Sequence, residues 1–525
     1  MRKTVKKLTA VGLTVTSVLG LVACGSSKGT TSQGTSENKE VTKPDTFTVM
    51  CVGTVVTETN GAEAFYKQLN EATGLDIKWT RPDHASYYDA VANAFNSDDT
   101  MPDVVLLSSD YYALYASNGF LWNMTDAWEH SETKNSGRLI STADNVLSAL
   151  MVNGEDGTKA MYGLSLYRGN GCCTYVKKAW LDKAGIDASK VKDVQMDFNT
   201  YYGYLKQMAQ TMGHYVISSP GFIHPEAPNT NYLPEFYQKA QYTFYKDTSG
   251  KYVDGFAQQE MKEALQRIQT AVNDGVIDKE SVNNSTANAR DKFYSTDPST
   301  ETGVFTYWAG TWANTLKTNL ANKGLDDELI AIKPIKELGA YTERIAPCWC
   351  ITSAAKNPEG IFKYFIDKML DGGDVQMLWT HGAKGTHWDD KAETVTVEKK
   401  EDQPKTYTEG QFHYLPGIEK PDQWQTKNHI DPILSIANFT NGYVGESLIP
   451  EVARENGEFF AENSQVAVPL PMTSELSNNI GDINTARTYV IAQVALGYMT
   501  VDEGMDYYNK TVGSLSNAVL KSLNK

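Results

Sequence analysis

The first hundred residues of the globular part alternate between short apolar runs and longer stretches with helical spacing. Three runs rich in β-branched or apolar residues are typical of strands, and they span 47–52, 75–79 and 101–107. Apolar residues recur with helical spacing in three stretches between and after these runs, which span 61–73, 87–96 and 111–119. This alternating order predicts a parallel sheet covered by helices.

Two loops follow strands of this predicted sheet at its carboxyl edge, where ligands of open α/β sheets usually bind. Glu58 and Asn60 follow the first strand, and Asp110 and Tyr111 follow the third. We expect these four residues to contact a ligand, although turn and surface roles are open for each.

The amino terminus has a separate pattern. Four basic residues precede an apolar run over 8–21, which is too short for a membrane span and is typical of a signal peptide. The following Leu-Val-Ala-Cys resembles the bacterial lipobox, which implies cleavage after residue 23 and lipidation of Cys24. Residues 24–44 are polar and predict a flexible tether. We therefore expect a lipid-anchored protein on the extracellular face of the bacterial cytoplasmic membrane, and an ordinary secretory signal is the alternative.

Charge excludes one class of partner. The whole chain carries a formal charge of −16, and the leader holds four of its 48 basic residues and none of its 64 acidic ones, so the mature chain is near −20. Nucleic-acid binding needs clustered Lys and Arg, so we expect no nucleic-acid partner.

Catalytic and metal-binding motifs are missing from the sequence. It contains no GxSxG, HExxH, Walker-type loop or CxxC pair, so we expect no enzyme, no cofactor and no metal site. A pair of facing carboxylates, as in a glycosidase, stays open as an alternative because acidic residues are plentiful.

Seven motifs, in order, resemble segments of family 1 extracellular solute-binding proteins of ABC transporters, in particular the larger lipoprotein-type carbohydrate-binding members. They lie at 160–165, 173–185, 247–253, 260–278, 303–312, 351–365 and 382–388. Examples are Ala-Met-Tyr-Gly-Leu-Ser, which ends in Ser165 where the family has proline, and Gly-Ala-Lys-Gly-Thr-His-Trp, which ends at Trp388. The resemblance covers about residues 45–390 and is looser beyond. There, 390–408 is charged and rich in turn residues, which is typical of a surface hairpin, and 487–498 and 501–523 are expected to form two closing helices of the second lobe.

The resemblance implies an α/β, two-lobed periplasmic-binding-protein-like fold with a ligand cleft between the lobes. On this basis the first lobe comprises 45–168 and 350–395, and the second comprises 175–345 and 396–525. The expected crossings between the lobes are 169–176 and 346–353.

The resemblance also suggests which aromatic residues line the cleft. Trp312 follows Gly-Thr at a place where family members put a ring that stacks on sugar, and Trp308, Trp349 and Trp388 lie in comparable motifs. Core packing is the alternative for each. Tyr167 and Arg168, just before the first crossing, complete the expected ligand-binding set.

The implied function is a monomeric receptor that closes on a small carbohydrate, an oligosaccharide, and delivers it to an ABC permease. A peptide or amino-acid receptor, with Arg168 as the charged clamp, is the alternative within the same fold. Four cysteines lie in the expected crossings, so we expect proximity there and leave open whether Cys172 or Cys173 bonds to Cys348 or Cys350.

Overall fold

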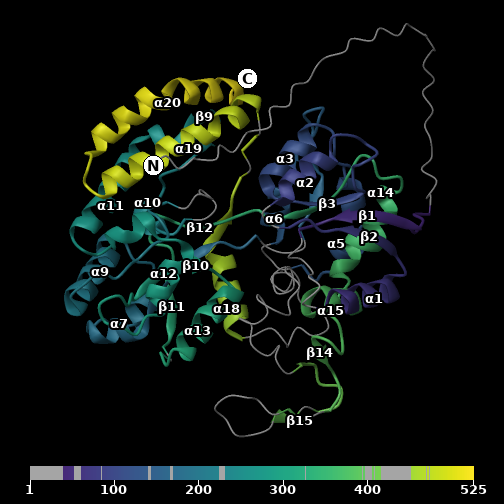
Figure 1. The fold of residues 1–525 in the computed structure, drawn as a ribbon, viewed down its shortest axis with the longest axis horizontal. Coiled ribbons are helices and arrows are strands. Elements are labelled where there is room, and N and C mark those ends of the chain that lie inside the picture. Colours follow the sequence, from purple (N-terminus) through teal and green to yellow (C-terminus); the bar gives the residue numbers. More distant parts are fainter. Residues whose placement is uncertain are drawn as a thin grey trace, which may run out of the picture.

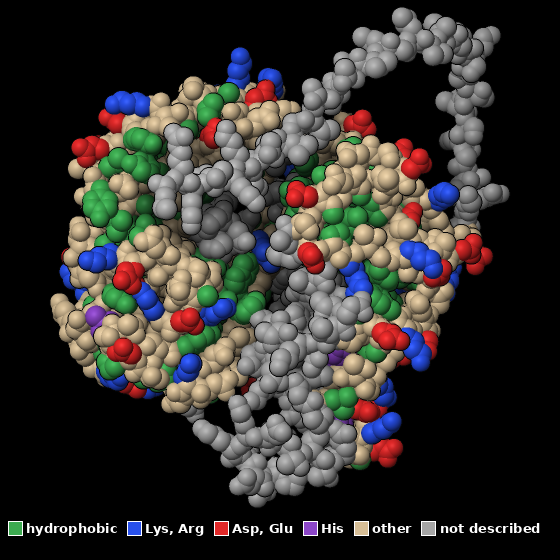
Figure 2. Space-filling view, viewed as in Figure 1, with side chains coloured by type: hydrophobic (Ala, Val, Ile, Leu, Met, Phe, Trp, Pro, Cys, Tyr) green, Lys and Arg blue, Asp and Glu red, His purple; other side chains and the backbone are tan. Residues whose placement is uncertain are grey.

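The computed structural model forms two α/β lobes that lie side by side (Figure 1), and the surface is hollowed between them (Figure 2). Its description covers 40–52, 61–83, 86–139, 143–165, 169–223, 231–325, 327–392, 394–395, 405–406, 408–415, 451–468, 470–471 and 473–525. Within these ranges no helix is long and apolar enough to cross a bilayer.

The first lobe is built on a five-stranded sheet in the order β2-β1-β3-β13-β6. Its strands are β1 (Thr46–Met50), β2 (Asp76–Thr80), β3 (Val104–Leu107), β6 (Gly163–Leu164) and β13 (Cys348–Ile351). As predicted, β1 pairs in parallel with both β2 and β3. The late strand β13 is antiparallel to β3 and β6 and lies between them.

Alternation along β1 sends side chains into two separate cores, one on each face of the sheet. Phe47 and Val49 pack in the core that contains Trp349 and Trp379, whereas Met50 packs with Tyr112 on the other face. Helices and short strands cover the two faces. They are α1 (Ala62–Thr73), α2 (Tyr87–Ala94), α3 (Ser109–Ser117), α4 (Thr125–Glu129), α5 (Glu132–Asn135), α6 (Ala143–Ala149), β4 (Met151–Asn153), β5 (Lys159–Met161), α14 (Pro358–Ile361), η5 (Phe362–Ile366), η6 (Asp367–Leu370) and α15 (Asp374–His381).

The second lobe has a three-stranded sheet with β7 in the middle. Its strands are β7 (Cys172–Lys177), β10 (Val304–Trp308) and β11 (Leu329–Ala331), and both outer strands run antiparallel to β7. Around the sheet lie α7 (Lys178–Lys183), α8 (Ser189–Lys192), α9 (Phe198–Met212), α10 (Pro234–Tyr237), β8 (Phe244–Lys246), β9 (Tyr252–Asp254), η3 (Gly255–Ala257), α11 (Gln259–Asn273), η4 (Lys279–Asn283), α12 (Thr286–Phe293) and α13 (Thr311–Asn322).

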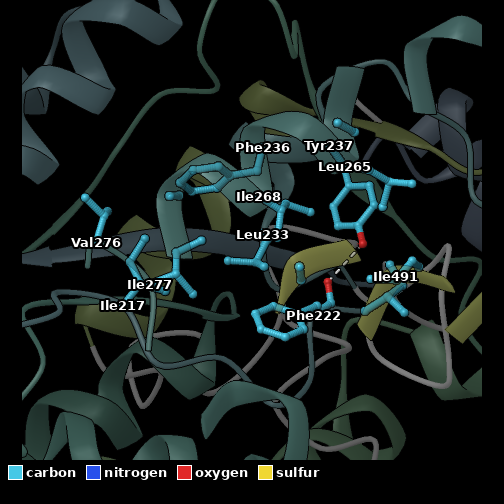
Figure 3. Packing of buried hydrophobic residues seen from close by; sticks show 14 of the residues in the cluster. Ile217, Phe222, Leu233, Phe236, Tyr237, Leu265, Ile268, Val276, Ile277 and Ile491 are labelled. Atoms are coloured by element: carbon cyan, nitrogen blue, oxygen red, sulfur yellow. Dashed lines mark hydrogen bonds between the residues drawn. The ribbon is translucent and has the colours of Figure 1, made fainter. Parts of the chain in front are cut away.

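One apolar core joins these elements to the carboxyl-terminal helices. Figure 3 shows Phe236, Leu265 and Ile268 packed together, with Ile491 beside them, and all four side chains are at most 1% exposed. The hydroxyl of Tyr237 in α10 donates to the carbonyl of Phe222 at 3.0 Å, so the polar end of this buried ring is satisfied.

The two final helices are α19 (Ser474–Ala495) and α20 (Val501–Leu523). Their expected ranges were 487–498 and 501–523, so α19 begins earlier than the apolar pattern indicates. Its polar first half is started by Thr473, whose side chain accepts from the amide of Leu476. Buried Arg487 then pairs with Asp254 at 2.8 Å, and this bond ties α19 to β9.

Short pairs of strands complete the described chain. They are β14 (Trp388–Asp389) with β17 (His413–Tyr414), β15 (Thr394–Val395) with β16 (Lys405–Thr406), and β12 (Tyr341–Glu343) with β18 (Ser464–Val466). The β15–β16 pair is the hairpin that charge and turn residues indicate near 390–408. Because β17 pairs with β14, 413–414 lies beside a first-lobe segment, although the sequence placed it in the second lobe. Helix α18 (Glu451–Asn463) packs on α13.

Three extended segments, which we call the interlobe segments, run together between the lobes: 169–171, 341–346 and 464–467. The amide of Arg344 donates to the carbonyl of Asn170 at 3.0 Å, and the amide of Ala467 donates to the carbonyl of Glu343 at 2.7 Å. The expected crossings 169–176 and 346–353 consist mostly of β7 and β13, which lie inside the two sheets. The first interlobe segment, 169–171, therefore falls at the start of the expected crossing 169–176, whereas 341–346 comes before most of the expected 346–353.

Glycine is required where the interlobe segments meet. A Cβ atom on Gly169 would lie 1.4 Å from the carbonyl oxygen of Arg344, and one on Gly171 would lie 2.2 Å from that of Thr342. Because the obstacles are backbone atoms, a side-chain rotation could not relieve either clash.

We predict that Gly169→Ala forces the interlobe segments apart and lowers the free energy of unfolding by about 1–3 kcal/mol, the usual cost of overpacking. Urea denaturation of the variant and the parent measures it. Gly203→Ala, at an exposed position in α9 with no atom within 4 Å of the added Cβ, is the matched control and should stabilise by about 0.5–1 kcal/mol. Equal effects of the two substitutions would contradict the close approach.

Candidate functional site

Strand ends from both lobes lie next to the interlobe segments. Leu107, the last residue of β3, is paired with Cys348, which follows the interlobe segment 341–346 by two residues. Trp308, the last residue of β10, is paired with Cys172, which directly follows 169–171. The loops after β3 and β10 therefore lie beside the interlobe segments. This is the candidate site.

Several residues predicted for the site cannot be placed. Glu58, Asn60, Tyr167 and Arg168 lie outside the described residues, as does Cys24. Asp110 begins the first turn of α3, but its side chain also lies outside the description. Their roles stay predictions.

Tyr111 is placed as predicted after β3, and its ring is stacked. Its centroid lies 3.9 Å from that of Tyr88, with the two planes 5° apart, and both rings are half-buried. The hydroxyl of Tyr88 accepts from the amide of Ser108 at 2.8 Å, so Tyr88 also fixes the loop after β3. The sequence analysis did not select Tyr88 as a site residue. Its position at the start of the predicted helix 87–96 could have indicated a ring close to the edge of the sheet.

Two of the four tryptophans are buried, which corrects the expectation that they line the cleft. Trp349 is 0% exposed and its ring meets Phe365 and Trp379 edge-on in the first-lobe core. It lies inside β13, where alternation points it to the core rather than past the edge of the sheet. Trp388 is 6% exposed, and its indole N–H donates to the carbonyl of Gly382 at 2.9 Å. Neither ring offers an open face for stacking.

The other two tryptophans lie at the second-lobe edge. Trp308 ends β10 and Trp312 lies in the first turn of α13, and both are half-buried. Trp312 meets Tyr307 edge-on at 5.5 Å, which holds its ring beside the turn. The guanidinium of Arg344 lies over the Trp308 ring, 4.6 Å from the centroid, so one face of that indole is occupied.

The turn between β10 and α13 is fixed by α18. The side-chain oxygen of Asn456 accepts from the amide of Gly310 at 2.7 Å and from the hydroxyl of Tyr175 at 2.8 Å. Asn170 contributes from the first interlobe segment: its side-chain amide donates to the carbonyl of Ala309 at 2.9 Å. Its φ of 59° is a left-handed conformation that asparagine tolerates better than most residues. Sequence patterns gave no signal for Asn456, which is distant in the chain.

A buried carboxyl group adjoins the interlobe strand β12. Glu235 in α10 is 1% exposed, and burial raises its pKa to about 7. The hydroxyl of Tyr341 lies 3.3 Å from its Oε1 but only 2.9 Å from the carbonyl of Ile332. Hydrogen bonds with the side chains of Thr174 and Tyr341 favour the charged carboxylate and lower its pKa, but the desolvation that burial causes outweighs them. Three titratable groups interact with this carboxyl electrostatically, and all are neutral at pH 7: Cys173, Tyr201 and Tyr341.

No disulfide forms among the described cysteines. Cys172 and Cys173 lie in the second-lobe sheet, whereas Cys348 and Cys350 lie in the first-lobe sheet and pack in a different core. Burial raises the pKa of Cys173 to about 12, and burial also raises that of Cys350. These thiols therefore stay protonated and serve as small core residues.

The described residues contain no group of three or more His, Cys, Asp or Glu side chains that could hold a metal ion. The candidate site instead offers aromatic rings, backbone amides and one guanidinium. Such groups bind, orient and desolvate a polar ligand that has apolar faces.

We predict that Glu235 makes stability fall as pH rises. The folded-state pKa of about 7 exceeds the ordinary value of 4.5, so between these pH values the folded chain binds more protons than the unfolded chain. The free energy of unfolding therefore falls by up to about 1.4 kcal/mol per pH unit over this range. Urea denaturation at pH 4.5–8 measures the free energy of unfolding. The free energy of unfolding of Glu235→Gln should rise relative to that of the parent as pH rises, and this difference should level off above about pH 7. Glu63→Gln, exposed on α1, is the control. A difference that does not change with pH would contradict the neutral carboxyl.

Comparison with known proteins identifies the fold. No family model matches the chain, and no curated protein matches its sequence. Among solved structures, an N-glycan transport solute-binding protein from Streptococcus pneumoniae is 16% identical, with TM-score 0.58, over 91% of this chain and 98% of that one. An alginate-binding protein, solved without calcium ion, is 15% identical, with TM-score 0.56, over 93% and 100%.

A family 1 extracellular solute-binding protein from Alicyclobacillus acidocaldarius is 14% identical, with TM-score 0.55, over 92% of this chain and 100% of that one. At these identities the likeness concerns the fold alone. The expectation from the ordered motifs is confirmed at that level: the chain has the two-lobed α/β fold of the family 1 extracellular solute-binding proteins.

Proposed function

We propose that this protein is a membrane-tethered extracellular receptor that captures a carbohydrate, an oligosaccharide, between its lobes and delivers it to an ABC permease. The observation that carries the proposal is the candidate site itself. Strand ends from both sheets bring aromatic rings next to the interlobe segments. Solved proteins of this fold include one named as an alginate-binding protein and one named as an N-glycan transport solute-binding protein.

The chemistry of the site suits a sugar. Carbohydrates combine apolar C–H faces with hydroxyl edges, and aromatic rings with polar groups at their rims match both. The first lobe offers the Tyr88–Tyr111 stack, and the second offers Trp312. Rings on both lobes would let one ligand contact both at once.

A ligand that contacts both lobes should bind the closed form more tightly than the open form. A ligand shifts a conformational equilibrium only by its differential affinity for the two states, and bridging contacts exist only when the lobes approach. The interlobe segments are extended and are hydrogen-bonded to one another, an arrangement about which two lobes could rotate as rigid bodies.

We predict that the mature chain binds oligosaccharides and becomes more compact when it does. Calorimetry against a panel of oligosaccharides measures affinity, and small-angle scattering with saturating ligand measures the radius of gyration. Trp312→Ala should weaken binding about tenfold or more, or about 1.4 kcal/mol per factor of ten. Tyr498→Ala, at a ring that is 73% exposed on the second lobe, should leave affinity unchanged. An absence of binding to every sugar tested would contradict the proposed ligand, and an unchanged radius at saturation would contradict closure.

We also predict that Cys24→Ala releases the protein from membranes. Lipid on Cys24 supplies the anchoring energy, about 0.8 kcal/mol per buried methylene, and the described residues contain no membrane-spanning helix. Fractionation of cells that express the parent and the variant, with immunoblotting of the membrane and the medium, measures the distribution. Cys51→Ala, at a buried position in the first-lobe core, is the control and should stay with the membrane. Retention of the Cys24 variant after signal removal would contradict the lipobox assignment.

A further inference from the structure

Arg344 is a cation at the candidate site, and Arg168, also predicted for this site, lies outside the described residues. It lies in the interlobe segment 341–346, half-buried, next to the second-lobe edge that carries Trp308. We propose that its guanidinium binds a carboxylate of the ligand, which would make the receptor selective for acidic sugars. This inference rests on the proposed function and deepens it by naming the ligand class.

The guanidinium is held in place from two directions. Its Nε donates to the carbonyl of Gly169 at 3.0 Å, and its Cζ lies over the Trp308 ring, 4.6 Å from the centroid. The contact with the Trp308 ring and the Nε hydrogen bond together hold the guanidinium without using its two terminal nitrogens. Most of the entropy cost of ordering a long side chain is therefore already met before any ligand arrives.

The terminal nitrogens have no protein partner among the described residues, since the Nε bond and the indole are the side-chain contacts that Arg344 makes there. The neighbouring carboxylate of Glu343 points elsewhere: it accepts from the amide of Gly169 at 3.1 Å and from the hydroxyl of Ser464 at 3.4 Å. The two terminal N–H groups of a fixed guanidinium match the two oxygens of a carboxylate and bind it bidentately.

The charge close to Arg344, and not the net charge of the chain, has to attract the anion. The chain as a whole is strongly acidic, at −16, so a negatively charged ligand would be repelled unless the site itself supplied a cation. The adjacent helix α13 begins at Thr311, directly after its N-cap Gly310, and its partial positive end adds to the potential that Arg344 creates. Trp308 and Trp312 on the same edge would contact the ring that bears the carboxylate.

A carboxylate could come from a sugar acid or from the end of a peptide, and the experiment separates them. An array of acidic and neutral glycans, with carboxyl-terminated peptides and their amides, is first probed with the mature chain. The acidic glycan bound most tightly is then compared with its methyl ester by calorimetry at low and high salt. The ester keeps the sugar and removes only the charge.

Three variants test the residue. Arg344→Gln should weaken binding of the acidic glycan at least tenfold and change binding of its methyl ester less than threefold. Arg344→Lys keeps the charge but loses the bidentate geometry, so it should fall between the parent and Arg344→Gln. Lys190→Gln removes the same charge from an exposed position on α8 and should change neither.

The outcomes distinguish this inference from the proposed function. Binding of neutral glycans only, or equal loss of acid and ester in Arg344→Gln, would overturn the carboxylate assignment and leave a carbohydrate receptor. Binding of peptides but no glycan would overturn both. Affinity of the parent for the acid that falls with salt, while affinity for the ester does not, supports the inference even if the Arg344 variants fail to fold.

Discussion

The two lobes depend on a backbone contact that only glycine permits. At Gly169 and Gly171 the outgoing chain passes so close to the returning segment that carbonyl oxygens occupy the space of a side chain. This approach sets where Arg344 and Asn170 lie, and through them the positions of Trp308 and of the turn after β10. The geometry of the candidate site thus depends on glycine at these two positions, because a Cβ atom would prevent the close approach.

A second constraint holds the far side of the second lobe. Arg487, 0% exposed, pairs with Asp254, whose other oxygen accepts from the hydroxyls of Tyr508 and Ser516. A buried ion pair of this kind stabilises little in itself, but losing one partner leaves an uncompensated charge. The bonds therefore fix one arrangement of α19 and α20 on the second lobe.

Sequence patterns predicted the parts of this structure that arise from local periodicity. The parallel β1–β2 and β1–β3 pairs follow from alternation and helical spacing, and the ordered motifs predicted the two-lobed fold. Burial of individual tryptophans was not predictable, because Trp349 and Trp308 both belong to apolar strands and differ only in which face or end meets the core. Arg344, Asn456 and Glu235 act through partners more than a hundred residues away, for which local patterns give no signal.

The position of β13 has a consequence for how the chain matures. Residues 348–351 lie between β3 and β6, so β6 has no neighbour in the first-lobe sheet until the whole intervening second-lobe segment has emerged. In a nascent chain the first-lobe sheet is consequently incomplete, and the edge of β3 is unpaired, until residues 348–351 have been synthesised. The edge of β3 that β13 covers therefore stays unpaired until this late strand is available, and an unpaired edge of this kind is a template for aggregation.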